Sequence, residues 1–205
     1  MITIKTLIFD FGDVFINLDK EGAMKNALDL FELDELPRDL ISINTLYEQG
    51  LISSEEFIEF YTENFPKLSK NNIINAWNFI LKDFPKERLT FLQNLKKEHH
   101  YKLILLSNTN ALHIDWIRER VSFYDDFKSC FDQFYLSHEI HLRKPNTDIY
   151  EFVLTENKLK AEQCLFIDDT KDNTDTAAQL GLHVWNIDET KEDIINMFTV
   201  KKDLF

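Results

Sequence analysis

Residues 5–14 have the sequence KTLIFDFGDV, in which an apolar, β-prone run ends abruptly in an acid and then a glycine. The segment 7–9 shows no alternation of polar and apolar residues, so it predicts a strand buried on both faces of a parallel sheet. In open sheets of this kind, ligand chemistry gathers just beyond the carboxyl ends of the strands. Asp10 would lie there, with Gly12 allowing a tight turn behind it. The alternative is an ordinary polar turn after a strand.

The composition limits the classes of protein to which the chain can belong. It has 205 residues, 44% hydrophobic and 29% charged, enough for one core or a core with a small second domain. No apolar run approaches the roughly 20 residues of a membrane span. The acid at Asp10 comes too early for a signal peptide, so we expect a cytoplasmic protein. Cys130 and Cys164 lack metal-ligand spacing and are expected to be reduced.

The net charge of −13 argues against nucleic acid as a partner, because no basic stripe is present. The same charge constrains any anionic substrate. A local cation must then override the repulsive field of the whole protein. The charge therefore favours a metal ion together with a few well-placed basic residues.

The segment after residue 16 is typical of consecutive helices. Residues 20–33 and 73–81 carry apolar side chains at helical spacing, and Ser53 with Glu56 forms a capping box. These patterns predict an all-helical insert over residues 17–84.

Trp77 lies in an apolar stripe of this insert. Aromatic residues at helical spacing are usually part of a core. Aromatic side chains also line clefts for small molecules, so Trp77 is our candidate substrate contact within the insert.

After the insert, strands and helices alternate along the chain. Apolar runs predict strands at residues 101–106, 130–136, 165–167 and 183–185, with helices over 111–120, from Pro145 onward, and up to Gly181. This order predicts an α/β fold, a doubly wound parallel sheet with a small all-helical cap inserted after the first strand. The expected domains are a core over 1–16 and 85–205 and a cap over 17–84.

Polar side chains stand at or shortly after the carboxyl ends of four predicted strands, which lie on one edge of a parallel sheet. They are Asp10, Ser107 with Asn108, Lys144 shortly after the third strand, and Asp168 with Asp169. Carboxylates gathered within a few ångströms repel one another and stay ionised only around a cation. Oxygen ligands without histidine or cysteine suit Mg²⁺. A hydroxyl, an amide and a lysine at a strand-to-helix turn suit a phosphate group. An aspartate held against that group can act as a nucleophile.

Four motifs carry a family resemblance: FDFGDV at 9–14, LSNTN at 106–110, RKP at 143–145 and FIDDTKDN at 166–173. In this order they resemble the haloacid dehalogenase (HAD) superfamily, and in particular its small capped sugar-phosphate phosphatases. The resemblance covers the whole chain, with the helical insert matching the cap. It implies the fold given above and a hydrolase with an aspartyl-phosphate intermediate.

The resemblance also implies a role for each motif residue. Asp10 would be the nucleophile and a metal ligand, and the carbonyl of Gly12 a second ligand. Asp168 would bind Mg²⁺ directly, and Asp169 directly or through water. Ser107, Asn108 and Lys144 would hold the phosphoryl group, with Asn173 supporting the acidic loop.

One position departs from the pattern of most phosphatases in the superfamily. These carry a second Asp two residues after the nucleophile as general acid and base, where this chain has Gly12. Loss of a general acid costs about 10²- to 10⁴-fold, least when the leaving group is already acidic. We therefore expect a substrate such as an anomeric sugar phosphate, with Asp13 as the alternative proton donor.

Three alternatives share parts of this pattern. A 2-haloacid dehalogenase also uses an Asp nucleophile, but it needs neither metal nor the acidic pair. A receiver-type signalling module has its acidic pair first in the chain and its lysine last, opposite to the order here. A phosphate-binding protein could have lost its chemistry through Gly12. The pattern as a whole predicts a Mg²⁺-dependent phosphatase of a small phosphorylated metabolite, with no nucleic-acid or membrane partner.

Overall fold

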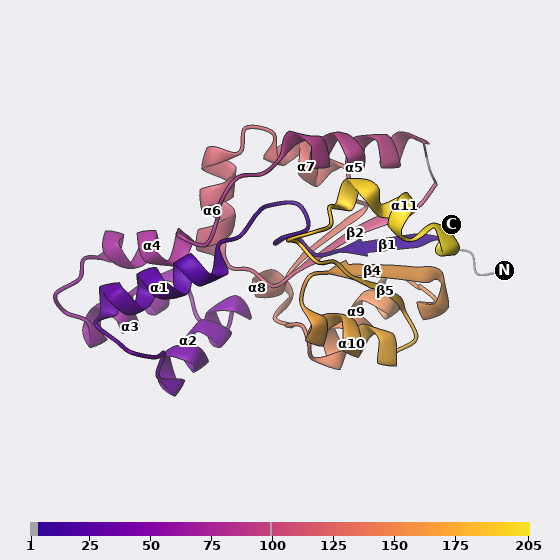
Figure 1. Ribbon diagram of the computed structural model, residues 1–205. Coiled ribbons are helices and arrows are strands. Elements are labelled where there is room, and N and C mark those ends of the chain that lie inside the picture. Colours follow the sequence, from indigo (N-terminus) through magenta and orange to yellow (C-terminus); the bar gives the residue numbers. More distant parts are fainter. Residues whose placement is uncertain (1–3, 99) are drawn as a thin grey trace.

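The computed structural model describes residues 4–98 and 100–205. In this part of the chain five strands form one parallel sheet in the order β3-β2-β1-β4-β5 (Figure 1). The strands are β1 (Thr6–Phe9), β2 (Lys102–Ser107), β3 (Gln133–Leu136), β4 (Cys164–Asp168) and β5 (His183–Asn186). The predicted α/β class and the parallel sheet are confirmed, with β1 at the centre.

The helices fall into two groups, those that cover the two faces of the sheet and those of the insert after the first strand. Their bounds are α1 (Lys20–Phe31), α2 (Arg38–Glu48), α3 (Ser54–Asn64), α4 (Lys70–Asn78), α5 (Lys86–Glu98), α6 (Ala111–Arg120), α7 (Tyr124–Ser129), α8 (Ser137–Ile140), α9 (Thr147–Glu156), α10 (Lys171–Gln179) and α11 (Met197–Val200). Helices α5, α6, α7 and α11 pack on one face, and α9 and α10 on the other (Figure 1). The sheet is therefore doubly wound. None of these helices is long and apolar enough to cross a membrane.

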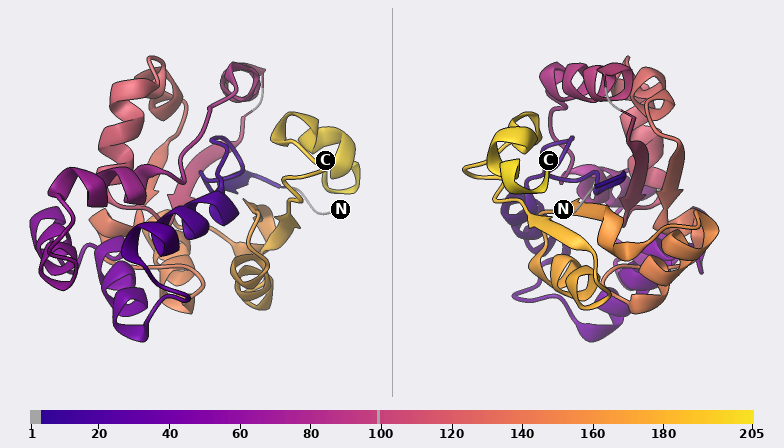
Figure 2. Two further views of the ribbon diagram at one scale, coloured as in Figure 1. Left: turned by 60° about the vertical axis from the view of Figure 1, so that its left-hand side comes forward. Right: turned by 90° about the vertical axis from the view of Figure 1, so that its right-hand side faces the viewer.

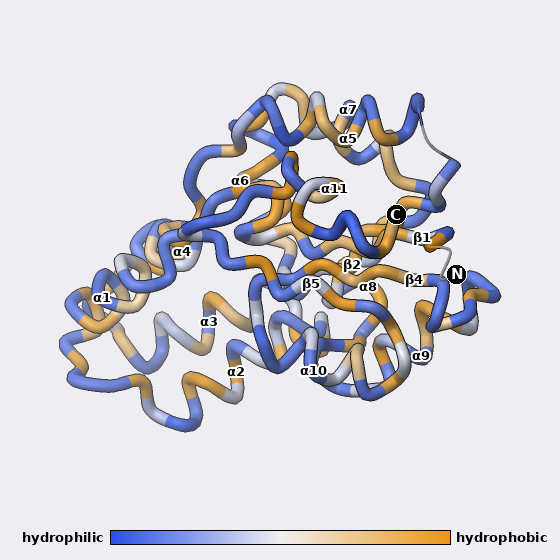
Figure 3. Tube along the Cα trace, turned by 45° about the vertical axis from the view of Figure 1, so that its right-hand side comes forward, coloured by the Kyte–Doolittle hydropathy of each residue, from blue (hydrophilic) through white to orange (hydrophobic). Residues whose placement is uncertain are grey.

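The central strand has its side chains in two separate cores, as expected for a strand covered on both sides. Leu7 and Phe9 join the cluster under α5, α6 and α7, whereas Ile8 joins the cluster under α9 and α10. Figure 3 shows the hydrophobic colour along the inner strands β2 and β4. Phe9 pairs with Leu105 on one side and Ile167 on the other, so Asp10 emerges between two rigid neighbours.

Helices α1 to α4 lie together beyond one end of the sheet, and the C-terminal elements lie at the opposite end (Figures 1 and 2). Helices α1 to α4 enclose their own hydrophobic cluster, which includes Phe31, Tyr47 and Phe57. The two segments that join them to the sheet run antiparallel, with the Asn17 N–H donating to the Asp83 carbonyl at 2.9 Å. These observations support the proposed cap over 17–84. Residues 1–3 of the proposed core lie outside the described residues.

Side-chain caps fix where several of these helices begin. The capping box at Ser53 is confirmed: Ser53 Oγ accepts from the Glu56 N–H at 3.2 Å, and Glu56 Oε2 accepts from the Ser53 N–H at 2.7 Å. Ser69 and Asn72 form a second box at the start of α4. Asp19 caps α1 by accepting from the Gly22 N–H at 2.8 Å. Helices α1, α3 and α4 thus start at points that the sequence specifies locally.

Two predicted elements differ from the structure. The third strand begins only at Gln133, because the residues before it form α7, whose C-cap is Cys130. Pro145 lies before the N-cap of α9, Asn146, and not in its first turn. Gly181 does end α10 as expected, with φ of +88° just past the C-cap, a conformation that suits glycine.

The aromatic core beneath the first face gives a test of the fold. Phe127 is 0% exposed. The rings whose centroids lie 5.0 Å from that of Phe127 are those of Phe11, Phe15, Phe84 and Phe131. Phe127→Ala should lower the free energy of unfolding by about 3–5 kcal/mol, because it leaves a cavity between rigid rings. Urea denaturation measures this, with the exposed Phe79→Ala as control. Equal losses in both variants would contradict this packing.

Candidate active site

Three carboxylates meet at the carboxyl ends of β1 and β4. Asp10 follows β1, Asp168 ends β4 and Asp169 comes next, and each offers an oxygen within 4.8 Å of the others. The parallel pairing of β1 with β4 brings them together across more than 150 residues of chain. Burial, reinforced by the charges of Asp168 and Asp169 and opposed by Lys144, raises the pKa of Asp10 to about 7. This cluster of carboxylates needs a positive charge beside it.

Lys144 supplies one such charge from within the protein. Its side chain is fully buried, with Nζ 2.9 Å from Asp10 Oδ1 and 2.6 Å from Asp168 Oδ2. Burial alone would lower the pKa of Lys144, but the two carboxylates outweigh it and the pKa is raised. The lysine is therefore held as a cation between the first and fourth strands.

Asn108 holds Lys144 in place through the backbone. Its amide nitrogen donates to the Lys144 carbonyl at 2.8 Å, and its amide oxygen accepts from the Lys144 N–H at 2.9 Å. This bidentate contact fixes the loop after β3 against the end of β2. Ser107, at the end of β2, is 2% exposed and lies beside it.

Asp168 is oriented by donors from the start of α10. Its Oδ1 accepts from the Thr170 N–H at 2.8 Å, and the Asn173 amide donates to both carboxylate oxygens at 3.0 and 3.1 Å. The Tyr150 hydroxyl in turn donates to the Asn173 carbonyl at 2.8 Å. Asn173 thus contacts the acidic loop through two hydrogen bonds to the Asp168 carboxylate.

A second lysine joins the acidic loop to the cap. Lys20, in the first turn of α1, places Nζ 2.8 Å from Asp13 Oδ2 and also pairs with Asp169. Burial opposes the charge of Lys20, but these hydrogen bonds raise its pKa. The other oxygen of Asp13 accepts from the Leu18 N–H at 2.8 Å. Both carboxylate oxygens of Asp13 are thus engaged within the protein.

The tight turn falls one residue later than the sequence analysis expected. The residue in the left-handed region is Asp13, with φ of +54°, and Gly12 lies outside that region. Gly12 is instead required for close approach, because a Cβ there would lie 2.6 Å from Leu18 Cδ1.

A pocket of about 300 Å³ opens above the carboxylates. We call it the sheet-edge pocket. The predicted site residues on its wall are Asp10, Gly12, Ser107, Asn108, Lys144 and Asp169. Asp168 lies beneath the wall, 0% exposed, within reach of Asp10 and Asp169. Residues far apart in the sequence therefore converge on one small pocket, as the strand-end argument predicted.

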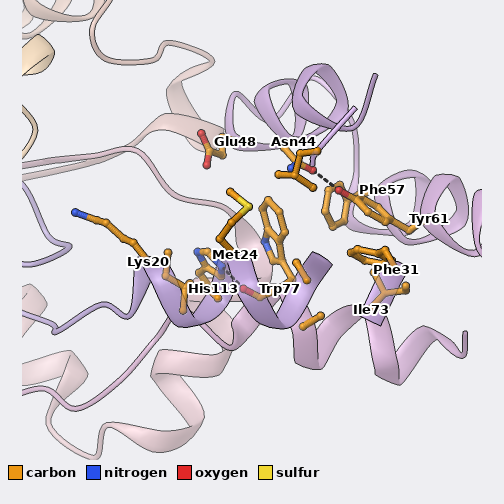
Figure 4. A pocket seen from close by; sticks show the side chains of 15 residues that line it. Lys20, Met24, Phe31, Asn44, Glu48, Phe57, Tyr61, Ile73, Trp77 and His113 are labelled. Atoms are coloured by element: carbon orange, nitrogen blue, oxygen red, sulfur yellow. Dashed lines mark hydrogen bonds between the residues drawn. The ribbon is translucent and has the colours of Figure 1, made fainter. Parts of the chain in front are cut away.

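Trp77 does not line the sheet-edge pocket. It lines a neighbouring cavity among the cap helices, which we call the cap pocket (Figure 4), where its ring stacks on His113 with centroids 5.5 Å apart. Lys20, Glu48 and His113 line both pockets, so the two are contiguous. Trp77 is thus placed beside the site and not among its charged groups.

Glu48 is a site residue that the sequence did not predict, and Arg143 was expected there only as part of the RKP motif. Arg143 Nε lies 2.8 Å from Glu48 Oε2, so this ion pair joins the end of α2 to the loop that carries Lys144. Nothing in the local sequence of α2 marks Glu48 as a site residue. Lys20 carried a weak signal, since it follows the first motif closely and begins a helix.

The donor set fits a hard divalent cation. The groups are carboxylate oxygens of Asp10, Asp168 and Asp169, without histidine or cysteine. Magnesium binds such oxygens and keeps several waters. The raised pKa of Asp10, caused by burial and by its acidic neighbours, is also the condition that a bound cation would relieve.

The parallel sheet, the helical insert after its first strand, and the buried lysine among three aspartates define a hydrolase of the haloacid dehalogenase type. A family model described as haloacid dehalogenase-like hydrolase matches residues 4–181, and the chain belongs to this family.

Among named relatives, the chain is similar to the D-ribitol-5-phosphate phosphatase of Bacteroides thetaiotaomicron. The two are 26% identical over 189 residues, which cover 89% of this chain and 91% of that protein. A HAD family enzyme of the same organism, solved as a magnesium complex, is 32% identical with a TM-score of 0.84, covering 95% of this chain and 98% of that one. A HAD-like family hydrolase from Porphyromonas gingivalis is 30% identical with a TM-score of 0.80, covering 97% of each chain.

The buried ion pairs of Lys144 predict a large effect on stability. In EDTA, Lys144→Met should lower the free energy of unfolding by about 3–5 kcal/mol, because it leaves the carboxylates of Asp10 and Asp168 without a counter-charge. Lys25→Met is the matched control, since the pair of Lys25 with Asp29 lies in solvent. Chemical denaturation measures both. If the two variants lost the same small amount, Lys144 could not be the cation that holds these carboxylates.

Proposed function

We propose that this chain is a Mg²⁺-dependent phosphatase that hydrolyses a small phosphorylated metabolite through an aspartyl-phosphate on Asp10. The observation that carries the proposal is the meeting of three aspartate oxygens within 4.8 Å below a pocket that Ser107 and Lys144 also line. Carboxylates, a hydroxyl and a buried ammonium are the groups that phosphoryl transfer requires.

In the proposed reaction, Asp10 attacks the phosphorus atom and the bond from phosphorus to the ester oxygen breaks. The ester oxygen leaves and takes a proton from water to give the alcohol. A second water then attacks the phosphorus of the aspartyl-phosphate and gives up a proton to solvent, which releases inorganic phosphate and restores the Asp10 carboxylate. Lys144 would neutralise phosphoryl charge, and Ser107 and Asn108 would border the phosphoryl group. Asp10, Asp168, Asp169 and the carbonyl of Gly12 would hold Mg²⁺, which supplies positive charge opposite the phosphoryl oxygens when bound.

The relatives support this proposal. One is named for hydrolysis of a phosphate ester. The related Bacteroides HAD enzyme has also been solved in complex with magnesium and inorganic phosphate, at 32% identity and a TM-score of 0.80. Both facts concern those proteins. The acidic cluster of Asp10, Asp168 and Asp169 in this chain is the reason to carry them over.

The state of Asp13 bears on the nature of the leaving group. Its carboxylate accepts from Leu18 and Lys20, so it is poorly placed to protonate a departing oxygen. Gly12 offers no side chain. We therefore propose an ester whose leaving group is acidic. The anomeric sugar phosphate expected from the sequence is one ester of this kind, and an aryl phosphate is another.

The alternatives fit the site less well. A dehalogenase without metal has no need of an acidic pair, yet Asp168 is held by Thr170 and Asn173 in a fixed orientation. A receiver-type module would keep its aspartyl-phosphate for minutes, and a binding protein would hold Mg²⁺ without hydrolysing any ester. Each makes a different prediction for the experiment that follows.

Removal of the metal or of the nucleophile should abolish hydrolysis. We expect release of phosphate from an aryl phosphate in Mg²⁺, loss of at least about 10³-fold in EDTA, recovery on adding Mg²⁺, and a similar loss in Asp10→Asn. Asp29→Asn, an exposed change on α1, is the control and should keep full activity. Activity that survives EDTA would favour the dehalogenase alternative.

The leaving group is tested with two esters of one sugar. Glucose 1-phosphate should be hydrolysed with a higher kcat/KM than glucose 6-phosphate, because its anomeric oxygen needs less help from a proton donor. The two esters are isomers, each a monophosphate of the same sugar. A preference for glucose 6-phosphate would count against the argument from Gly12 and Asp13.

A further inference from the structure

The cap pocket is large enough to hold the organic part of a substrate. Its volume is about 280 Å³, near the lower end of the range of roughly 300–1,000 Å³ common for ligand sites. Figure 4 shows the rings of Phe31, Phe57 and Trp77 around it, with the thioether of Met24 nearby. The wall is therefore built mainly from carbon and sulfur.

Most polar groups on this wall are already bonded within the protein. The exception is the indole N–H of Trp77, which is buried without a hydrogen-bond partner among the described residues. The Tyr61 hydroxyl donates to Asn44 Oδ1 at 2.7 Å (Figure 4). His113 Nε2 lies 3.1 Å from the Trp77 carbonyl. Burial lowers the pKa of His113 to about 4, so its ring is neutral near pH 7. A hydroxyl group entering the pocket would give up water and meet chiefly carbon.

The two pockets share part of their walls. Lys20, Glu48 and His113 line both the cap pocket and the sheet-edge pocket, and Ile80 does so as well. The charged groups lie at the boundary: in Figure 4 Lys20 and Glu48 stand on one side of the pocket, away from the aromatic rings. A phosphate ester with its phosphorus beside Asp10 would thus extend its organic group past this boundary into the cap.

We propose that the substrate is a phosphate monoester whose organic group is largely apolar, an aryl or alkylaryl group, and not a sugar or polyol. The inference rests on the proposed phosphatase function and names its substrate class. Burial of carbon against the cap pocket would stabilise such an ester in proportion to its apolar area. A polyol would bury hydroxyls without partners, which costs binding.

The proposal separates this chain from its named relative. That protein is called a D-ribitol-5-phosphate phosphatase, and ribitol carries hydroxyls along its whole carbon chain. An aryl ester, in contrast, also provides an acidic leaving group. The apolar cap pocket and the engaged Asp13 therefore favour the same chemical class from independent observations.

The first test is a substrate series at constant leaving-group chemistry. We expect kcat/KM to rise from phenyl to 4-ethylphenyl to 4-butylphenyl phosphate by up to about fourfold per added methylene group. 4-Ethylphenyl phosphate should exceed 4-(hydroxymethyl)phenyl phosphate, which has nearly the same shape, by about tenfold or more. Hexyl phosphate should exceed D-ribitol 5-phosphate, both being esters of primary alcohols.

The second test fills the pocket. Ala27 lines the cap pocket, whereas the side chain of Lys25 on the same helix is 76% exposed. Ala27→Leu should lower the ratio of kcat/KM for 4-butylphenyl over phenyl phosphate by about tenfold, because the added carbons occupy the space of the butyl group. Lys25→Leu should leave this ratio unchanged. Thermal melting of both variants shows whether each is folded.

The outcomes distinguish the two proposals. If no ester releases phosphate above the level of Asp10→Asn, the phosphatase function itself is wrong, and the substrate class falls with it. If phosphate is released but D-ribitol 5-phosphate or glucose 1-phosphate is the better substrate, or the ratio across the aryl series is flat, the apolar class alone is wrong.

Discussion

The structure depends on the neutralisation of buried negative charge at one edge of the sheet. Asp10 and Asp168 lie at the ends of adjacent parallel strands, where burial and mutual repulsion disfavour two carboxylates. Lys144 makes this arrangement stable by placing its ammonium 2.9 and 2.6 Å from the two groups. The neighbouring structure serves to hold these charges: Asn108 fixes the backbone of Lys144, and Asn173 fixes Asp168. A site with so little conformational freedom is suited to a reaction that depends on electrostatic preorganisation.

The same electrostatic constraint links the cap to the sheet. A chain with a net charge of −13 repels anions, and the cations nearest the acidic loop come from two different parts of the fold. Lys144 belongs to the loop after β3, whereas Lys20 begins α1, directly after the segment that leads into the cap. Movement of the cap would therefore move a charge that contacts Asp13 and Asp169. The geometry of the acidic loop and the position of the cap are coupled through this side chain, and the ion pair of Arg143 with Glu48 forms a second link.

Much of the site could be predicted from the sequence because its residues follow apolar strands. Asp10, Ser107 and Asp168 each end such a run, and parallel topology then brings them together whatever the chain between them does. The fold class and the helical insert follow from a change in the hydrophobic pattern. Short continuous apolar runs indicate strands buried on both faces, whereas apolar residues with a period of 3.6 residues indicate helices. The sequence places the start of β3 at Cys130, and the structure places it at Gln133. Cys130 and Phe131 are as apolar as strand residues, but Cys130 caps α7 and the ring of Phe131 packs against that of Phe127 in this helix. Among the cap residues that border the sheet-edge pocket, Lys20 had only a weak local signal and Glu48 had none.

Glu48 and Trp77 illustrate the limit most clearly. Glu48 ends an ordinary amphipathic helix, and only its meeting with Arg143, far along the chain, makes it part of the site. The stripe that contains Trp77 serves two purposes at once, since one side of it packs in the cap cluster while the other lines a cavity. Apolar side chains at helical spacing are the same pattern in both roles. The proposed catalytic residues stand at or near strand ends and can be recognised in a single sequence. The residues of the cap pocket lie on helix faces, and they become visible only when the helices enclose a space.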